Sequence, residues 1–267
     1  MMSKTCCALP NLFGKPFLTD YQLRLPEMRK LILVVPVLAV IAALMLVVAG
    51  PGTRLGIWEF GFGFTLMRWA LYFGVAAAIL GVVLAIIPKT RRGNLGGLLA
   101  AVVIGLGAAA VPYLLVQQAQ SVPRIHDITT DTVDPPAFVA IAPLREDAPN
   151  PVEYAGEETA SQQREAYPDI TTFQADLYPA IVFEHALGAV ERMGWELVEA
   201  DEEEGRIEAT DTTFWFGFKD DVVIRIRADN GGSRVDVRSK SRVGLSDVGA
   251  NAARIRKYLD ELEARLR

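Results

Sequence analysis

Three long runs of apolar residues occupy the first half of the chain. They cover Leu31–Ala49, Trp69–Ile87 and Leu95–Val116, and none of them contains Asp, Glu, Lys, Arg or His. A helix of roughly 17 to 25 apolar residues is long enough to cross the hydrocarbon core of a bilayer. The pattern therefore predicts three transmembrane helices, at about 31–49, 69–87 and 95–116, after a cytoplasmic tail over residues 1–30.

The pattern changes after the third apolar run. Residues 117–178 are rich in proline, which removes backbone donors and breaks helices, so this segment is predicted to be an extended linker. Residues 179–267 contain a helical pattern, short alternating runs and a second helical pattern at the end of the chain. This order predicts an α+β domain, in which an antiparallel sheet packs against a long C-terminal helix. The same order also allows a helix-grip-like arrangement.

One hairpin is strongly specified by its turn. Asn230-Gly231 favours a type I′ turn, which would pair Ile226 with Val235 and Ile224 with Val237 on one face of the sheet. Arg225 would then oppose Asp236 on the other face. We expect only the first face to be buried. The second face would carry a basic stripe formed by Arg225, Arg227, Arg234, Arg238 and Lys240.

The run before this hairpin, "TTFWFGFKDD", is predicted to be a further extended segment. Phe214, Phe216 and Phe218 alternate with Trp215, so both faces of the run are apolar. Burial in the core is the expected reason. A contact of Trp215 with an apolar ligand or with a membrane is the alternative.

The stretch "RSKSRVGLSDVGANAARIR" leads from the hairpin into the last helix. Ser246 or Asp247 is expected to cap that helix, because its side-chain oxygen can accept from free N–H groups. An apolar stripe indicates the face that packs on the sheet, and it consists of Val248, Ala252, Ile255, Leu259, Leu262 and Leu266. Helical geometry places a polar flank about a quarter-turn away, formed by Asp247, Asn251, Arg254 and Tyr258.

Five residues are candidates for a ligand site at this corner: Arg238, Arg242, Asp247, Asn251 and Arg254. In one interpretation the arginines converge on an anion, with N–H groups of the helix assisting. In the other, Arg238 or Arg242 bonds Asp247, and Asn251 ties strand to helix as part of the packing. The sequence leaves both interpretations open.

Charge is divided unevenly between the two halves. Residues 1–120 contain 10 Lys and Arg against 3 Asp and Glu, whereas residues 121–267 contain 17 against 29. Basic residues flank the first run and separate the second from the third, which predicts a cytoplasmic N-terminus and a periplasmic C-terminal domain in a bacterial inner membrane. Nucleic acid is an unsuitable partner for so acidic a domain. Met28 also resembles a natural start of translation. Residues 1–27 are therefore either a cytoplasmic tail or lie upstream of the true start.

His126, Asp127 and Asp131 form a weaker candidate site inside the proline-rich segment. A histidine beside carboxylates could act in the active site of a hydrolase. No second His or Cys lies nearby to complete a metal site, so neither a metal nor a cofactor is predicted. Such runs of Asp and Thr are also common in turns and caps.

Four stretches, "DITTD", "YPDI", "FKDDVVIRIR" and "DVRSKSRVGLSDVGANAARIRKYL", together resemble the domain of unknown function 1499 family over residues 123–267. The resemblance implies a fold and a cell-envelope setting, but no activity. We therefore expect a non-enzymatic membrane protein with a binding module for a membrane lipid, an anionic ligand or an envelope protein. The alternatives are an envelope hydrolase that uses His126, and a structural subunit that anchors a complex.

Overall fold

The computed structural model describes residues 25–267, so most of the predicted tail over 1–30, including residues 1–24, lies outside the described residues. The chain divides into two compact units. One contains the chain up to Leu46 together with Met67–Ala110, and the other contains Val47–Leu66 together with Val111–Arg267.

Three long helices are apolar enough to cross a membrane: α2 (Leu25–Arg54), α3 (Phe60–Ile86) and α5 (Leu95–Ser121). A short helix, α4 (Pro88–Arg91), precedes α5. The helix α3 begins at Phe60, nine residues before the predicted start of the second span, because the aromatic stretch before Trp69 is already helical. These helices indicate a membrane protein.

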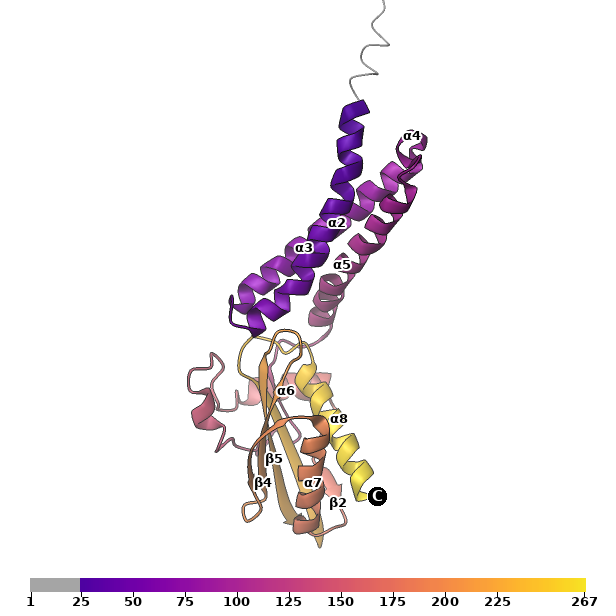
Figure 1. The fold of residues 1–267 in the computed structure, drawn as a ribbon. Coiled ribbons are helices and arrows are strands. Elements are labelled where there is room, and N and C mark those ends of the chain that lie inside the picture. The colour runs from indigo at the N-terminus through magenta and orange to yellow at the C-terminus, as the bar shows by residue number, and fades with distance from the viewer. Residues whose placement is uncertain (1–24) are drawn as a thin grey trace, which may run out of the picture. The chain divides into compact units, whose positions relative to one another are not determined.

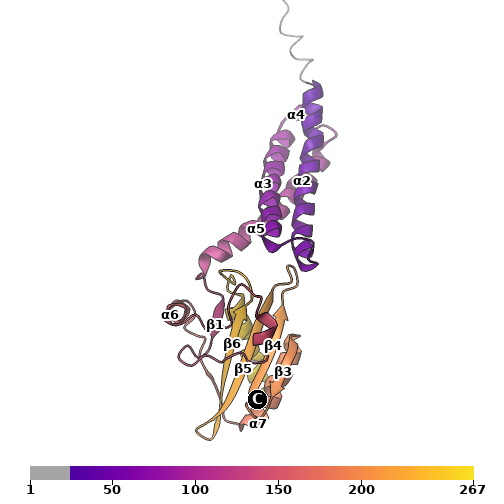
Figure 2. The same cartoon turned by 90° about the vertical axis from the view of Figure 1, so that its left-hand side faces the viewer.

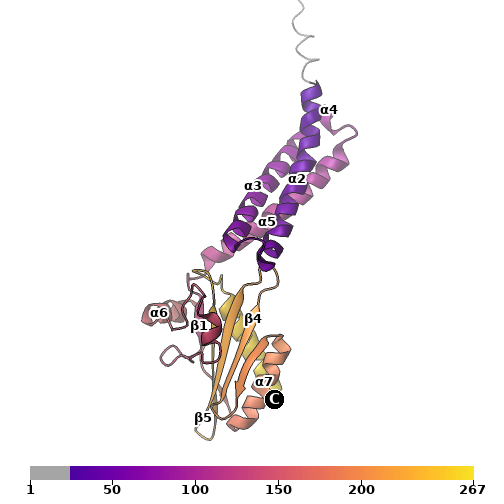
Figure 3. The ribbon, with the colours of Figure 1, turned by 60° about the vertical axis from the view of Figure 1, so that its left-hand side comes forward.

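Within the first unit the long helices run side by side (Figure 3). Gly74 of α3 and Gly105 of α5 face each other so closely that a Cβ at either position would lie about 2.5 Å from the carbonyl oxygen of the other. Small residues permit such an approach between membrane helices. Gly105, one of the glycines of the third apolar run, thus allows α5 to pack closely on α3.

The second unit contains one antiparallel sheet. Its strands follow the order β1-β6-β5-β4-β3, and β2 pairs with β6 off this path. The strands are β1 (Asp127–Thr129), β2 (Phe173–Ala175), β3 (Glu196–Asp201), β4 (Arg206–Thr212), β5 (Lys219–Asp229) and β6 (Gly232–Ser241). The segment predicted as a linker therefore supplies two strands, and the α+β class is confirmed.

The β5–β6 hairpin has the predicted register, with Ile226 opposite Val235 and Arg225 opposite Asp236. Its two turn residues, Asn230 and Gly231, have φ values of 50° and 89°. Positive φ at both central positions is what a type I′ turn requires, and this turn matches the twist of the strands.

Two helices, α7 (Pro179–Met193) and α8 (Ala250–Leu266), lie side by side over one face of the sheet (Figure 1). The predicted apolar stripe of α8 lies in this core, except for Val248, which precedes the helix with a φ of 57°. Tyr258 was predicted on the polar flank, and this was wrong. It is fully buried, stacks on Trp195 and donates to the Ala186 carbonyl, because α7 widens the buried face of α8.

The opposite face of the sheet is also covered, which corrects the expectation of a solvent-exposed basic stripe. Residues 130–156, which we call the covering segment, cross this face and include the short helix η1 (Ala142–Arg145) (Figure 2). A further helix, α6 (Glu157–Ala166), follows the segment. Phe138 and Ile141 pack on Val223 of β5. Three residues of the predicted stripe, Arg225, Arg238 and Lys240, are therefore buried.

Candidate functional site

The five predicted corner residues do not form one cluster. Side chains alternate between the faces of a strand. Val235 and Val237 of β6 face the helices, so Arg238 and the following Arg242 lie on the side of the covering segment. Arg254 projects from α8 on the helical side. The three arginines therefore do not point toward one position, as the anion-binding interpretation would require.

Arg238 is buried in an ion pair with Asp127 of β1. Its Nε and Nη2 lie 2.9 and 2.8 Å from the two carboxylate oxygens. Lys240 Nζ donates to the same carboxylate at 3.0 Å. Burial lowers the pKa of Lys240, and the charge of Asp127 opposes that shift. Arg238 also donates to the carbonyls of Pro136 and Val152, which ties the covering segment to the sheet.

Arg242 has an equivalent partner on β5. Its Nε and Nη2 lie 2.9 and 2.8 Å from the oxygens of Asp221, and its Nη1 donates to the Leu144 carbonyl. Arg145 of η1 donates to Asp221 as well, at 3.1 Å. Asp221 is fully buried, and the two arginines compensate its charge.

Arg254 bridges α8 to three strands, β4, β5 and β6, on the helical side. It donates to Asp211 at 2.8 Å, to Asp220 at 2.6 Å and to the Ser239 hydroxyl at 3.1 Å. Asn251, which is fully buried, accepts from Ser239 and donates to the carbonyl of His126 at 3.0 Å. These contacts correspond to the structural interpretation, in which Asn251 ties strand to helix.

Asp247 organises the backbone before α8. Its two oxygens accept from the N–H groups of Gly249 and Asn251, each at 2.8 Å. Burial raises its pKa, and these two hydrogen bonds oppose the shift. Ser246 accepts from the N–H of Val248. Neither Arg238 nor Arg242 bonds Asp247, because both point to the other face of the sheet.

His126 and Asp127 line one hollow, whereas Asp131 lies in another. Asp127 is bound by Arg238 and Lys240. Nδ1 of His126 is buried and has no hydrogen-bond partner within the described chain. Burial lowers the pKa of His126, and the nearby Lys240 lowers it further, so the imidazole is neutral at pH 7. Among residues 25–267, no group of three or more His, Cys, Asp or Glu could hold a metal ion.

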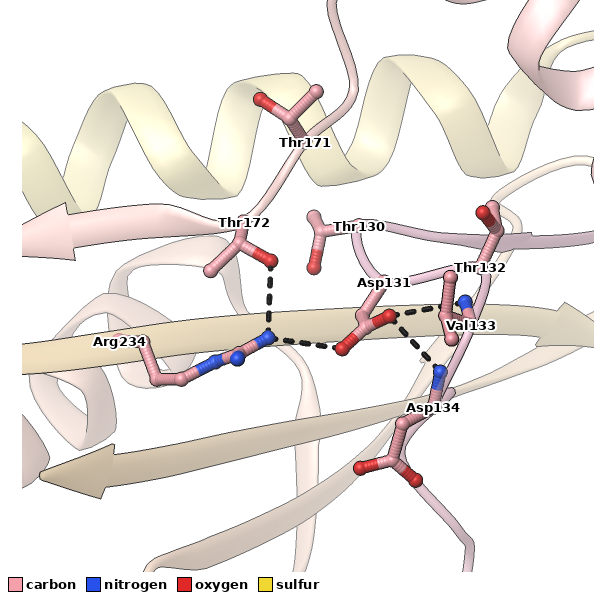
Figure 4. A pocket seen from close by; sticks show the side chains of 8 residues that line it. All are labelled: Thr130, Asp131, Thr132, Val133, Asp134, Thr171, Thr172 and Arg234. Carbon is pink, nitrogen blue, oxygen red and sulfur yellow. Dashed lines mark hydrogen bonds and ion pairs between the residues drawn. The ribbon is translucent and has the colours of Figure 1, made fainter. Parts of the chain in front are cut away.

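Asp131 lies instead in a threonine-rich hollow (Figure 4). One oxygen accepts from the N–H groups of Val133 and Asp134, and the other lies 2.9 Å from Nη2 of Arg234. Burial would raise the pKa of Asp131, but these hydrogen bonds and the arginine charge lower it. Arg234 also contacts Thr172. These polar groups are bonded to one another, which favours a structural role.

A second hollow, which we call the His126 hollow, has a different character. Its lining includes Arg124, His126, Glu158, Thr159, Gln162 and Leu245. Within the described residues the side chains of Arg124, Glu158, Thr159 and Gln162 make no hydrogen bond or ion pair. Leu245 is 73% exposed beside them. Polar groups that lack partners inside the protein are available to a ligand.

Sequence reasoning singled out His126 but missed the rest of this hollow. Arg124 follows α5 by three residues, and a cation directly after an apolar span was its only signal. Thr159 and Gln162 lie on α6, inside a stretch that was predicted to be extended. No local pattern relates these residues, because the fold of the covering segment brings α6 to β1.

Comparison with known proteins gives a family match within the second unit. No curated protein matches the sequence. A family model described as "Protein of unknown function (DUF1499)" matches residues 127–262, from the first residue of β1 to Leu262 of α8. The match covers more than half of the chain and contains the buried pairs of Arg238, Arg242 and Arg254. The chain therefore belongs to the DUF1499 family of proteins of unknown function.

Proposed function

We propose that this chain is a non-enzymatic membrane protein that binds the headgroup of a phospholipid in the His126 hollow. The single observation that carries the proposal is the set of unpaired polar side chains that line this hollow, with Arg124 as its cation. In this proposal the α+β domain lies on the periplasmic side of a bacterial inner membrane, held there by α2, α3 and α5.

The orientation rests on the distribution of basic residues. Lys89, Arg91 and Arg92 lie between the second and third candidate spans, whereas the link between the first and second carries Arg54 and, further on, Arg68. Short loops rich in Lys and Arg stay in the cytoplasm. The end of α5 at Ser121, and the domain that follows it, then face the other side of the membrane.

The position of Arg124 in the chain supports contact with a lipid phosphate. It lies three positions after Ser121, the end of the third candidate span, so chain geometry keeps it within about 11 Å of that end. Phospholipid headgroups occupy this zone next to the hydrocarbon core. An arginine without an internal carboxylate partner can donate two hydrogen bonds to one phosphate.

The other lining groups suit the same ligand. Neutral His126 has one N–H to donate, and Thr159 and Gln162 add a hydroxyl and an amide. Glu158 offers a carboxylate that can pair with the amine of a zwitterionic headgroup. The exposed Leu245 can contact an acyl chain. The shared chemistry is a phosphate diester, whether the rest of the headgroup is anionic or zwitterionic.

Hydrolysis through His126 has less support. A general base of this kind is normally oriented by a hydrogen-bonded carboxylate. Asp127 and Asp131, the predicted partners, are engaged by Arg238 and Arg234 respectively. Within the described chain His126 makes no side-chain hydrogen bond that would orient its ring.

The proposal can be tested by native mass spectrometry of the full chain in micelles. The protein is titrated separately with phosphatidylglycerol, phosphatidylethanolamine and a diacylglycerol that lacks the phosphate. Binding of the phospholipids should weaken about tenfold in Arg124→Gln, since a charge-assisted hydrogen bond contributes about 1.5 to 3 kcal/mol. The matched control is Arg192→Gln, which removes another exposed arginine, from α7.

Equal affinities of the wild type and Arg124→Gln would contradict the proposal, as would equal binding of diacylglycerol. Preference for phosphatidylethanolamine that is lost in Glu158→Gln would identify the zwitterionic headgroup as the ligand. Topology is tested separately by reporter fusions after Arg124. A cytoplasmic signal from those fusions would overturn the proposed orientation.

A further inference from the structure

The turn that joins β4 to β5, residues Thr213–Phe218, carries four aromatic residues in six positions. The sequence pattern predicted an extended run, but these residues form a closed turn. Phe218 donates its N–H to the Thr213 hydroxyl at 2.8 Å, and the Thr213 N–H donates to the Phe218 carbonyl at 2.8 Å. Gly217 has a φ of 72°, a conformation that favours glycine. The closed turn projects Phe214, which is 90% exposed.

The turn packs against the end of α2 and the beginning of α3, which belong to the same compact unit as the turn. Phe216 lies 5.2 Å from Phe64 between ring centroids, and Phe218 lies 5.9 Å from Phe60. Arg54 donates to the carbonyl of Phe214, and its guanidinium lies 5.8 Å from the centre of the Phe214 ring. The aromatic turn and this link between helices therefore form one cluster.

The partners of the turn fix its depth relative to a bilayer. Arg54 is the last residue of the first candidate span, and Phe60 is the first residue of the second. The ends of membrane spans lie at the boundary between headgroups and acyl chains, where aromatic side chains are enriched. A turn that packs against both ends lies at the same level. Phe214, with almost no protein contact, would then meet lipid rather than water.

We propose that the Thr213–Phe218 turn docks the domain into the membrane interface, with Phe214 inserted among phospholipids, whereas Trp215 packs on Gly50 of α2. The occupant of this surface is the bilayer that α2 and α3 cross, because the cluster is continuous with their ends. Burial of an exposed phenylalanine in an apolar environment is favourable, so the turn adds a contact beyond the spans themselves. This inference uses none of the residues of the His126 hollow.

The test places a fluorescent label at the tip of the turn in the full chain. Cys6 and Cys7, the two cysteines of the sequence, are replaced by serine, and Phe214→Cys supplies one labelling position. Labelled protein is reconstituted in vesicles of phosphatidylcholine and phosphatidylglycerol that contain nitroxide lipids. The label should emit at a shorter wavelength than the free dye in buffer, and it should lose most of its fluorescence to nitroxides near the headgroup.

Tyr178→Cys is the matched control, since Tyr178 is also an exposed aromatic residue, at 71%. It follows Leu177, whose carbonyl accepts from Ser233 near the far end of the long hairpin. The 11 residues of β5 separate that end from the aromatic turn by about 33 Å. Its label should be quenched much less.

Equal quenching at Phe214→Cys and Tyr178→Cys, whether strong or weak, would overturn the inference. A Phe214 label that is quenched mainly by nitroxides deep in the acyl chains would also contradict placement at the interface. The two proposals can fail independently. Arg124→Gln should weaken phospholipid binding in the His126 hollow without changing the quenching of the label at Phe214→Cys.

Discussion

Asp127 of β1 and Arg238 of β6 form a two-point ion pair in which both side chains are almost completely buried. The pair joins a short edge strand to the long hairpin, across 111 positions of sequence. Lys240 adds a second cation to the same carboxylate. Two of the stretches that resemble the family, "DITTD" and "DVRSKSRVGLSD", thus meet in one buried cluster. Their charges hold the fold together.

Asp127→Asn should therefore destabilise the domain strongly. The substitution leaves Arg238 and Lys240 buried without a compensating charge, which costs about 3 to 5 kcal/mol in other buried pairs. We expect a loss of this size in the free energy of unfolding, measured by urea titration of the full chain in micelles. The readout is the tryptophan fluorescence of a variant in which Trp195, in the domain core, is the one tryptophan kept of the four in the sequence.

Asp169→Asn is the matched control for that substitution. Asp169 pairs with Arg256, but both side chains are about half exposed. An exposed ion pair contributes at most about 1 kcal/mol, so this variant should unfold close to the wild type. Equal losses in the two variants would show that burial of the Asp127 pair has no special role.

A second prediction concerns the covering segment. The carboxylate of Glu208 on β4 accepts from three consecutive N–H groups, those of Val139, Ala140 and Ile141, at 2.8 to 3.1 Å. Glu208→Gln removes the charge and one acceptor oxygen, and hydrogen bonds to a charged group contribute about 1.5 to 3 kcal/mol each. The covering segment should open more often. Trypsin should then cleave after Arg145, which is buried in the wild type.

Glu199→Gln provides the comparison, because Glu199 is more exposed and bonds Arg206 rather than the covering segment. Its cleavage rate at Arg145 should match that of the wild type. Unchanged cleavage in Glu208→Gln as well would mean that other contacts are sufficient to close the segment.

The β5–β6 hairpin shows what the sequence could predict. Asn230-Gly231 determines the turn type, and the turn determines the whole register, so local information was sufficient. The apolar stripe of α8 was equally local. Ala252, Ile255 and Leu262 recur at helical spacing and all are buried.

The environment of Arg238 shows what the sequence could not predict. Its strand pattern indicates a charged face, which is compatible both with solvent and with buried carboxylates. The carboxylate that decides between them, Asp127, is far away in the chain. The predicted polar environment of Tyr258 was wrong for a related reason. A helical wheel locates one packing face and takes no account of a second neighbour such as α7. The His126 hollow likewise depends on contacts between distant segments.

A third prediction concerns the membrane helices. A side chain at Gly105 would collide with the backbone of Gly74, so Gly105→Val should force α3 and α5 apart. Overpacking of this kind costs about 1 to 3 kcal/mol. We expect the variant to lose its helical structure at a lower concentration of sodium dodecyl sulfate, as followed by circular dichroism. Gly107→Val is the control, because a Cβ at Gly107 meets no atom within 4 Å.

The control also separates two roles for the small residues of α5. If Gly107→Val were as harmful as Gly105→Val, the face of α5 that carries Gly107 would have to contact another chain. The expected difference between the two variants corresponds to packing among α2, α3 and α5 within one chain.

The last prediction follows from the half-buried imidazole of His126. Burial lowers its pKa below the ordinary value of 6.5, as does the positive charge of Lys240, while Asp127 opposes the shift. The unfolded chain therefore binds a proton at this residue at a higher pH than the folded chain does. The free energy of unfolding should consequently fall as the pH drops below about 6.5, until the folded state is protonated too.

Other groups titrate in the same range, so the measured quantity is the difference in stability between the wild type and His126→Gln. That difference should shift against the wild type between pH 7.5 and pH 5, whereas a difference that stays constant over this interval would show that His126 has the same pKa in both states.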